Sequence, residues 1–188
     1  IGIKREDFVL SARTMDFSTE MYTTVTLNPR GVKRTSINLK SDEKSVEWVS
    51  KYGSVTMNAY GLGASDGLNE EGLSAAVLWL SMTKWPAPDS RPVLSVNLWV
   101  QYCLDNFRTV NEAVENLKTI RVYSMSLYGV NDGLDFPLHL VLHDAEGDSA
   151  VLEYLDGKLV IHHPMEQPVC TNDPDYAQHL NKLKKYKL

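Results

Sequence analysis

Residues 54–80 have the sequence SVTMNAYGLGASDGLNEEGLSAAVLWL, and this stretch decides the fold. Ser54–Ala59 at its start and Leu73–Leu80 at its end are runs of the length and composition typical of β-strands. The segment between them, Gly61–Gly72, has the highest density of glycine and other turn residues in the chain and predicts a loop. The stretch therefore predicts two strands that flank a glycine-rich loop.

Strand patterns extend from this stretch toward the N-terminus. Ile1–Lys4 and Phe8–Arg13 lie on either side of a polar turn and predict a hairpin. Thr23–Leu27 is rich in β-branched residues and ends at the turn sequence Asn28-Pro29-Arg30-Gly31, after which Val32–Leu39 predicts another strand. The chain before residue 54 is therefore expected to be mainly β.

The period of the apolar residues changes after the first set of strands. Val93–Phe107 has apolar residues at helical spacing, and Thr109-x-x-Glu112 is a capping box that opens a second helix through Leu117. A third helical pattern covers Tyr176–Leu188. Helices are therefore predicted both before and after the last strands in the sequence.

Those last strands are predicted at Leu138–His143, Ser149–Tyr154 and Lys158–His162. Asp156-Gly157, between the last two, is a strong signal for a two-residue hairpin turn. The three runs therefore predict a second antiparallel sheet.

The order of strands, helices, strands and helix predicts an α+β fold in which two antiparallel sheets pack face to face with helices outside. Residues 1–188 contain no repeat or linker, so we expect a single domain. The chain begins at Ile1 rather than Met and ends within a helical pattern. We therefore expect this domain to be incomplete at both ends.

The composition excludes several classes of partner. The chain has 188 residues, 43% of them hydrophobic and 23% charged, and a net charge of −5. No apolar run is long enough for a transmembrane helix, and we expect no membrane association. Lysines and arginines are scattered, so nucleic acid is not an expected partner. Their one short run consists of Lys182, Lys184, Lys185 and Lys187.

The two cysteines, Cys103 and Cys170, have none of the spacings of a metal site, and neither a metal nor another cofactor is expected. Unpaired buried thiols are the favoured interpretation, with a disulfide as the alternative. The redox compartment stays open.

Arg13 and Asp16 are the first candidates for chemistry. Arg13 lies on the period-two face of a strand that is otherwise mainly apolar, and Asp16 follows where that strand should end. By themselves, the two residues are interpreted most simply as a surface ion pair at a sheet edge.

Three blocks of the sequence resemble the choloylglycine hydrolase and penicillin V acylase family. They occur in the family's order and at compatible spacing, and together they cover nearly the whole chain. The blocks are Ala12-Arg13-Thr14-Met15-Asp16-Phe17, Asp66-Gly67-Leu68-Asn69-Glu70-Glu71-Gly72-Leu73 and Thr171-Asn172-Asp173-Pro174. The resemblance implies a four-layer αββα N-terminal-nucleophile hydrolase fold and hydrolysis of a non-peptide C–N bond in linear amides.

Such a hydrolase uses an N-terminal cysteine as nucleophile and its own α-amine as base. The resemblance places this cysteine a few residues before Ile1, outside the sequence. Arg13 then favours the thiolate, and Asp16 orients the α-amine. A second active-site arginine of the family would also lie outside the sequence, beyond the last block.

The resemblance also assigns the oxyanion hole and the pocket. Asn172 matches the family's side-chain donor, and Trp79 supplies the backbone N–H donor. Trp79, Met15 and Phe17 are expected to line the substrate pocket. The alternatives from the residues alone are a turn-initiating Asn172 and core positions for the three apolar side chains. A tryptophan at position 79 resembles the Gram-negative branch of the family more than the Gram-positive enzymes, which have tyrosine or asparagine there.

Other polar residues receive no catalytic role. Asn69 and Glu70 are expected to organise the glycine-rich loop. Neither cysteine is expected to be the nucleophile. The histidines are also left without a role; they are His139, His143, His162, His163 and His179.

The expected substrate is a small N-acyl amide with an aromatic or fatty acyl group, such as penicillin V or an acyl-homoserine lactone, in preference to a conjugated bile salt. The oligomeric state stays open, with a homo-oligomer as one option. A periplasmic or secreted location is implied by resemblance only, with the cytoplasm as the alternative. Two other classes stay open: an inactive relative that binds amphipathic acyl ligands, and a different N-terminal-nucleophile enzyme such as a glutamine-dependent amidotransferase.

Overall fold

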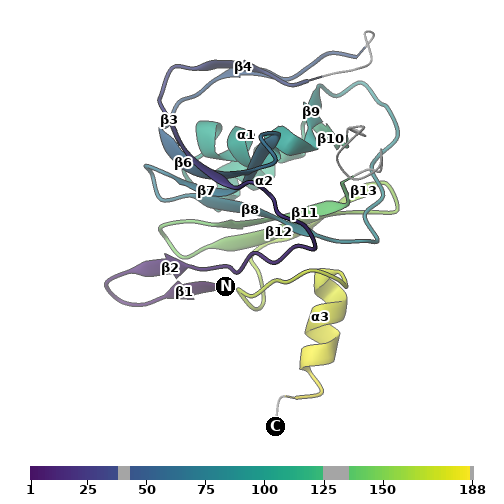
Figure 1. Ribbon diagram of the computed structural model, residues 1–188. Coiled ribbons are helices and arrows are strands. Elements are labelled where there is room, and N and C mark those ends of the chain that lie inside the picture. Colours follow the sequence, from purple (N-terminus) through teal and green to yellow (C-terminus); the bar gives the residue numbers. More distant parts are fainter. Residues whose placement is uncertain (38–42, 125–135, 187–188) are drawn as a thin grey trace.

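The computed structural model describes residues 1–37, 43–124 and 136–186 and has the predicted α+β fold (Figure 1). Its largest element is a seven-stranded antiparallel sheet in the order β13-β12-β11-β8-β7-β6-β3. The strands are β3 (Thr24–Asn28), β6 (Ser54–Ala59), β7 (Gly63–Asn69), β8 (Ser74–Trp79), β11 (Leu138–His143), β12 (Ser149–Leu155) and β13 (Lys158–His162).

One face of this sheet is covered by helices α1 (Trp99–Asn106) and α2 (Val110–Leu117). The predicted cap of α2 is confirmed, because the Thr109 hydroxyl accepts a hydrogen bond from the Glu112 N–H at 3.2 Å. The helices and the sheet bury one large apolar cluster, in which Trp99, Leu104, Val110, Leu140 and Leu152 are fully buried. This core fixes the positions of the strand ends at which the candidate residues lie.

The helix predicted from Val93 begins later. Val93–Ser95 forms β9, which pairs in parallel with β10 (Arg121–Tyr123), and a 3₁₀ turn (η1, Val96–Leu98) precedes α1. The backbone N–H and C=O groups of β9 are satisfied by β10, which lies far away in the sequence. Helical spacing of apolar residues cannot reveal such a partner.

The loop predicted over Gly61–Gly72 is wrong for most of its length, because Gly63–Asn69 forms β7 between β6 and β8. Gly63 and Gly67 within β7 permit close packing, whereas Gly61 and Gly72 have positive φ angles in the turns on either side of it. A Cβ on Gly67 would lie 2.6 Å from the carbonyl oxygen of Val55 on β6. Glycine within a strand permits this approach of two backbones.

The prediction of a second sheet formed by β11, β12 and β13 is also wrong. β11 pairs with β8 from Leu138↔Trp79 to His143↔Ser74, so these strands extend the first sheet. The edge of β8 offers unpaired backbone groups, which a further strand satisfies. The predicted hairpin turn is confirmed by positive φ angles at Asp156 and Gly157.

Three two-stranded sheets accompany the large one. The predicted N-terminal hairpin is confirmed as β1 (Gly2–Lys4) and β2 (Val9–Ser11). The strand predicted over residues 32–39 is present as β4 (Lys33–Thr35), which pairs with β5 (Glu47–Val49); residues 38 and 39 lie outside the described part. β5 was not predicted.

The second face of the large sheet is covered unevenly. The segment 163–175 and helix α3 (Tyr176–Leu183) pack on β11 and β12, where Val141, Val151, Met165 and Tyr176 form a smaller core. Figure 1 shows α3 and the β1–β2 hairpin on the side of the sheet away from α1. The helix predicted to Leu188 ends at Leu183; residues 187 and 188, with Lys187 of the basic run, lie outside the described part.

The same face is open along β3, β6 and β7. Its large apolar side chains are exposed there, at 69% for Val25, 78% for Leu27, 44% for Val55, 39% for Met57 and 53% for Leu68. The pairings Val25↔Met57, Leu27↔Val55 and Val55↔Leu68 place all five on one face. Within residues 1–37, 43–124 and 136–186, no helix has the length and apolar character needed to span a bilayer.

Candidate functional site

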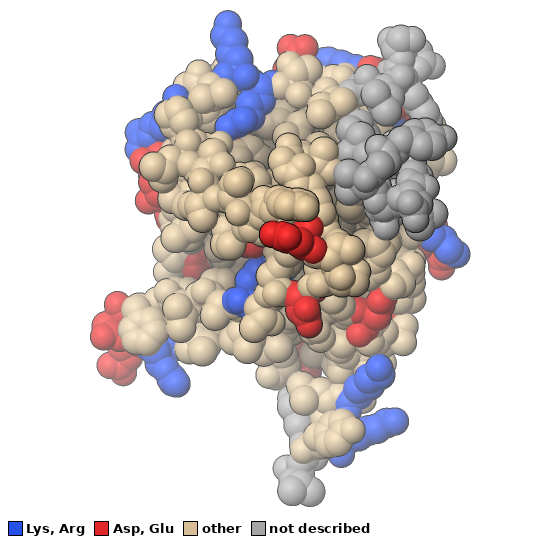
Figure 2. Space-filling model, in the orientation of Figure 1, with Lys and Arg blue, Asp and Glu red and all other residues tan. Residues whose placement is uncertain are grey.

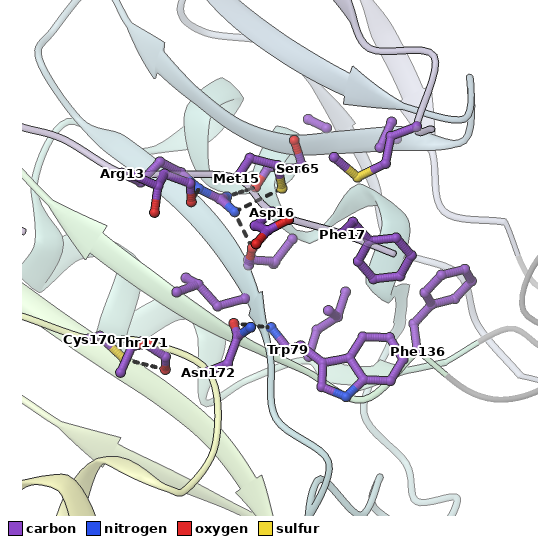
Figure 3. Close-up of a pocket in the computed structure, with 18 of the residues that line it drawn as sticks. Arg13, Met15, Asp16, Phe17, Ser65, Trp79, Phe136, Cys170, Thr171 and Asn172 are labelled. Atoms are coloured by element: carbon purple, nitrogen blue, oxygen red, sulfur yellow. Dashed lines mark hydrogen bonds between the residues drawn. The ribbon is translucent and has the colours of Figure 1, made fainter. Parts of the chain in front are cut away.

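A cavity of about 650 Å³ lies where the chain segment after β2 meets the ends of β7 and β8 and the segment before α3 (Figure 3). All the residues proposed from the sequence line it, which are Arg13, Met15, Asp16, Phe17, Trp79 and Asn172. Segments more than 150 residues apart in the chain are thereby brought together. The structure thus assembles the predicted set in one place.

Arg13 crosses from its own segment to the large sheet. Its Nη1 donates to the carbonyl oxygens of Ser65 at 3.2 Å and Val77 at 3.1 Å, and it lies 3.4 Å from Asp66 Oδ2. The side chain is only 23% exposed. Burial lowers the pKa of Arg13, and the Asp66 carboxylate opposes this shift. The interpretation of Arg13 as half of a surface pair with Asp16 is wrong, because its carboxylate partner is Asp66.

Asp66 was missed as a member of the site. Its Oδ2 also accepts a hydrogen bond from the Ser65 hydroxyl at 3.1 Å, so it is held on both sides. The available signal was the aspartate that opens the second family block. Asp16 lines the cavity between Met15 and Phe17 in sequence, and Figure 3 shows it beside Arg13 and the cavity.

Asn172 and Trp79 are in direct contact. The Trp79 backbone N–H donates to Asn172 Oδ1 at 3.2 Å, which leaves the Asn172 Nδ2 group as the amide donor (Figure 3). This arrangement differs from the expected pair of independent donors, because one donor is directed at the side chain of the other. A ligand oxygen that accepted hydrogen bonds from both the Trp79 N–H and the Asn172 Nδ2 group would have to displace Asn172 Oδ1 from the Trp79 N–H.

A second set of contacts joins the same two segments. Asp173 accepts hydrogen bonds from the Ser81 N–H at 2.7 Å and the Ser81 hydroxyl at 2.6 Å, and the Trp79 indole N–H donates to that hydroxyl at 3.0 Å. His179 Nε2 lies 2.8 Å from the Asn172 carbonyl oxygen. No site role was assigned from the sequence to Ser81, to His179 or to Asp173, although Asp173 belongs to the third family block. We call the group Trp79, Ser81, Asn172 and Asp173 the clamp.

Aromatic side chains form one wall of the cavity. The rings of Phe17 and Trp79 have centroids 6.1 Å apart, and Phe17 lies edge-on to Tyr60 at 6.4 Å. Met15 and Phe17 are 37% and 42% exposed, so the alternative of core positions is wrong for both. Figure 2 shows acidic and basic side chains near the middle of the view, within an otherwise uncharged surface. The aromatic wall of the cavity suits an apolar group.

Asn69 has the structural role that was expected. It is 3% exposed, and its side-chain amide donates to the carbonyl oxygens of Leu104 at 2.9 Å and Phe107 at 2.8 Å. Its Oδ1 accepts from the N–H groups of Glu71 and Leu73. Asn69 thereby ties the β7–β8 turn to the end of α1.

Both cysteines are free thiols, so the alternative of a disulfide is excluded in this structure. Cys103 is fully buried in α1. Cys170 lines the cavity next to the Asn172 segment.

Comparison with known proteins places this geometry in a family. A family model described as linear amide C–N hydrolases, choloylglycine hydrolase family, matches residues 3–188. A penicillin V acylase from Pectobacterium atrosepticum is 40% identical over 182 residues, which is 93% of this chain and 48% of that protein.

Solved structures show the same fold. The structure of penicillin V acylase from Agrobacterium tumefaciens has a TM-score of 0.83 at 41% identity, covering 98% of this chain and 55% of that chain. A variant of conjugated bile acid hydrolase from Clostridium perfringens has a TM-score of 0.82 at 24% identity, covering 98% and 56%; at that identity the likeness concerns the fold alone. The chain spans about half the length of these relatives.

Proposed function

Because this chain belongs to the choloylglycine hydrolase family of linear amide C–N hydrolases, we propose that its cavity binds the acyl part of a small N-acyl amide and that the protein hydrolyses the amide bond. The observation that carries the proposal is the convergence of Arg13, Asp16, Asn172 and Trp79 on one cavity with an aromatic wall. The family's chemistry needs these groups around one thiol.

We propose that the nucleophile is a cysteine that precedes Ile1 in the full-length protein. β1 pairs with β2 in the register Gly2↔Ser11, and the Ile1 nitrogen donates to the Ala12 carbonyl oxygen at 2.9 Å. Continued upstream at about 3.3 Å per residue, this strand runs beside Arg13 and the residues after it. A cysteine there enters the cavity that Ile1 already lines.

Each neighbour of that cysteine has a defined task. The Arg13 cation favours the thiolate, and its hydrogen bonds to β7 and β8 keep it at the cavity wall. The Asp16 carboxylate accepts a hydrogen bond from the terminal ammonium group and orients it. The terminal amine takes the thiol proton, and the thiolate attacks the amide carbonyl to give a tetrahedral oxyanion. The oxyanion collapses to a thioester as the terminal ammonium group returns that proton to the leaving amine. Water then hydrolyses the thioester, which releases the acid and restores the thiol.

The oxyanion is stabilised by the Asn172 Nδ2 group together with the Trp79 N–H. For the second donor to act, the substrate oxygen takes the place that Asn172 Oδ1 holds in this structure. The clamp keeps both donors within reach while this exchange takes place, because Ser81 and Asp173 join the same two segments independently.

The aromatic wall favours an aryl or fatty acyl group. Phe17, Tyr60 and Trp79 offer flat apolar surfaces, which suit the phenoxyacetyl group of penicillin V or the acyl chain of an acyl-homoserine lactone. A protein that cleaves only glycine- or taurine-conjugated bile salts would overturn this preference.

The experiment uses the full-length protein and penicillin V. Replacement of the cysteine that precedes this segment by serine or alanine should abolish hydrolysis while the melting temperature is retained. Full activity in a folded variant would refute the mechanism. A folded wild-type protein that binds N-acyl amides without cleaving them would instead support the inactive relative.

The open face of the large sheet supports a further part of the proposal. The exposed side chains of β3, β6 and β7, Val25 and Leu27 among them, form a continuous apolar surface on one face. We propose that the second sheet of the four-layer fold covers it and that this sheet comes from residues beyond Leu188. Limited proteolysis of the full-length protein should then leave both parts associated.

A further inference from the structure

A buried line of ionisable side chains runs under the cavity and is not used by the proposed mechanism. His139 on β11 and Glu153 on β12 are both 0% exposed, and His139 Nδ1 lies 3.0 Å from Glu153 Oε1. His162 on β13 lies 3.3 Å from the other carboxylate oxygen. Three neighbouring strands thus each contribute one such group to the same interior region. Burying ionisable groups costs free energy, and such clusters mark functional sites more often than other buried positions.

The line ends at a thiol on the cavity wall. Cys170 Sγ lies 4.0 Å from His139 Nε2, and Cys170 lines the cavity two residues before Asn172 (Figure 3). A cysteine, a histidine and a carboxylate in this sequence of contacts have the arrangement by which thiol enzymes activate a nucleophile. Cys103 has no such neighbour on a cavity, since it is fully buried in α1.

The charge state of Glu153 fixes the orientation of the histidine proton. Burial raises the pKa of Glu153, but the hydrogen bonds with His139 and the Tyr176 N–H, together with the neighbouring His162 ring, outweigh burial and lower it to about 2. An ionised carboxylate only accepts hydrogen bonds, so His139 Nδ1 carries a proton toward it. In the neutral ring, Nε2 then presents its lone pair to the sulfur of Cys170.

The resting sulfur is protonated. Burial, followed by the charge of Glu153, raises the pKa of Cys170 to about 12. A thiol in this state reacts slowly unless a base removes its proton as the new bond forms. His139 is the base in position to do so.

We propose that Cys170, with His139 as its base, is a second reactive thiol of the cavity and a site of covalent modification by apolar electrophiles such as aryl-substituted Michael acceptors. The sulfur bonds to the β-carbon of the acceptor, the C=C π bond breaks, and its electron pair moves to the α-carbon. His139 Nε2 takes the thiol proton, and the α-carbon is protonated in return. No other reactant is needed, and the adduct occupies the cavity beside Asn172.

The test treats the full-length protein with N-phenylmaleimide and follows the peptides containing Cys170 and Cys103 by mass spectrometry. Each thiol is read separately, and the measurement is repeated in the variant whose upstream cysteine is replaced by serine, because an adduct of that cysteine would fill the cavity that Cys170 lines. The variant lacks the proposed hydrolysis, so labelling of Cys170 is tested independently of it. We expect Cys170 to be labelled with a rate that saturates with reagent concentration, and Cys103 to stay unlabelled. Labelling of Cys170 as slow as that of Cys103, or a rate strictly linear in reagent, would overturn the proposal.

Two variants test the base. His139→Gln keeps an N–H donor for Glu153 but has no base, and should slow the labelling of Cys170 by about 10²-fold or more. His162→Gln, on the other side of Glu153, is the matched control and should keep the wild-type rate. Unlabelled Cys103 reports that each variant is folded; if His139→Gln opens the fold, the wild-type saturation measurement decides. A wild-type rate in folded His139→Gln would refute the role of His139.

Discussion

The replacement of Arg13 by lysine tests the site most directly, because it keeps the charge and removes the planar donor group. Arg13 Nη1 serves the carbonyl oxygens of Ser65 and Val77 and lies next to Asp66. A lysine ammonium group placed near Asp66 for the charge loses at least one of the two carbonyl contacts. A hydrogen bond lost at a largely buried site costs about 1 kcal/mol, so we expect a loss of about 1–2 kcal/mol in the free energy of unfolding.

Differential scanning calorimetry of the full-length Arg13→Lys variant should show this loss as a melting temperature lower by at most about 2–8 °C, since 1 kcal/mol corresponds to about 2–4 °C for a chain of about 150–250 residues and to less for a longer chain. The rate of penicillin V hydrolysis should fall with it, because the cation no longer has a fixed position beside the thiolate. Arg91→Lys is the control: Arg91 also binds a carboxylate, Asp89 at 2.6 Å, but lies outside the cavity lining. An unchanged melting temperature and an unchanged kcat in Arg13→Lys would refute the reasoning.

Four other substitutions test the remaining contacts. Asn172→Ala should lower kcat for penicillin V by about 10²–10³-fold with little change in melting temperature, and a KM effect alone would contradict its role as an oxyanion donor. Ser81→Ala releases the indole of Trp79 and should raise KM for aryl amides more than it lowers kcat; equal changes for an acetyl amide would argue against the clamp. Asn69→Ala leaves four backbone groups, three of them buried, without this partner and should destabilise the fold by several kcal/mol in urea unfolding, at about 1–3 kcal/mol for each buried group that stays unpaired. Glu153 has a pKa lowered to about 2, so its contribution to stability is present above its ordinary pKa and should be lost as the pH falls toward 2; Glu153→Gln should flatten this part of the pH profile of unfolding, and an unaltered profile would exclude the effect.

The local pattern of the sequence predicted elements well where one dominant signal was present. Thr109 and Glu112 fixed the start of α2, and Asp156-Gly157 fixed the turn between β12 and β13. Both depend on contacts within a few residues, so the information lies in adjacent positions. The same reasoning failed for β7, where Gly63 and Gly67 indicated a loop.

The failure at β7 has a physical reason. Gly67 is required because β6 approaches closely, and only the pairing of β6, β7 and β8 reveals this. The prediction that β11, β12 and β13 form a separate sheet failed for the same reason. The sequence of β11 does not indicate whether it pairs with β12 alone or also with β8. Strand order depends on long-range pairing, which period and composition do not encode.

The candidate site shows the same division between local and distant information. The family blocks are sufficient to group Arg13, Asp16 and Asn172 in one site, yet they do not indicate which acceptors Arg13 uses. Its partner Asp66 lies 53 positions away, on a strand whose glycines indicate a loop. The error in β7 therefore also hid the partner of Arg13.

Cys170 is a residue whose chemical environment could not be predicted from the sequence. In the sequence it is an ordinary thiol beside a family block, and His139 is one of five histidines without a motif. Their meeting depends on the pairing of His139 with Glu153 across β11 and β12 and on the return of the chain over that face before α3. Both thiols have raised pKa values from burial, but only Cys170 has a base and an open cavity beside it. Reactivity at this wall is therefore a property of the assembled sheet, and labelling of Cys170 against Cys103 measures that assembly directly.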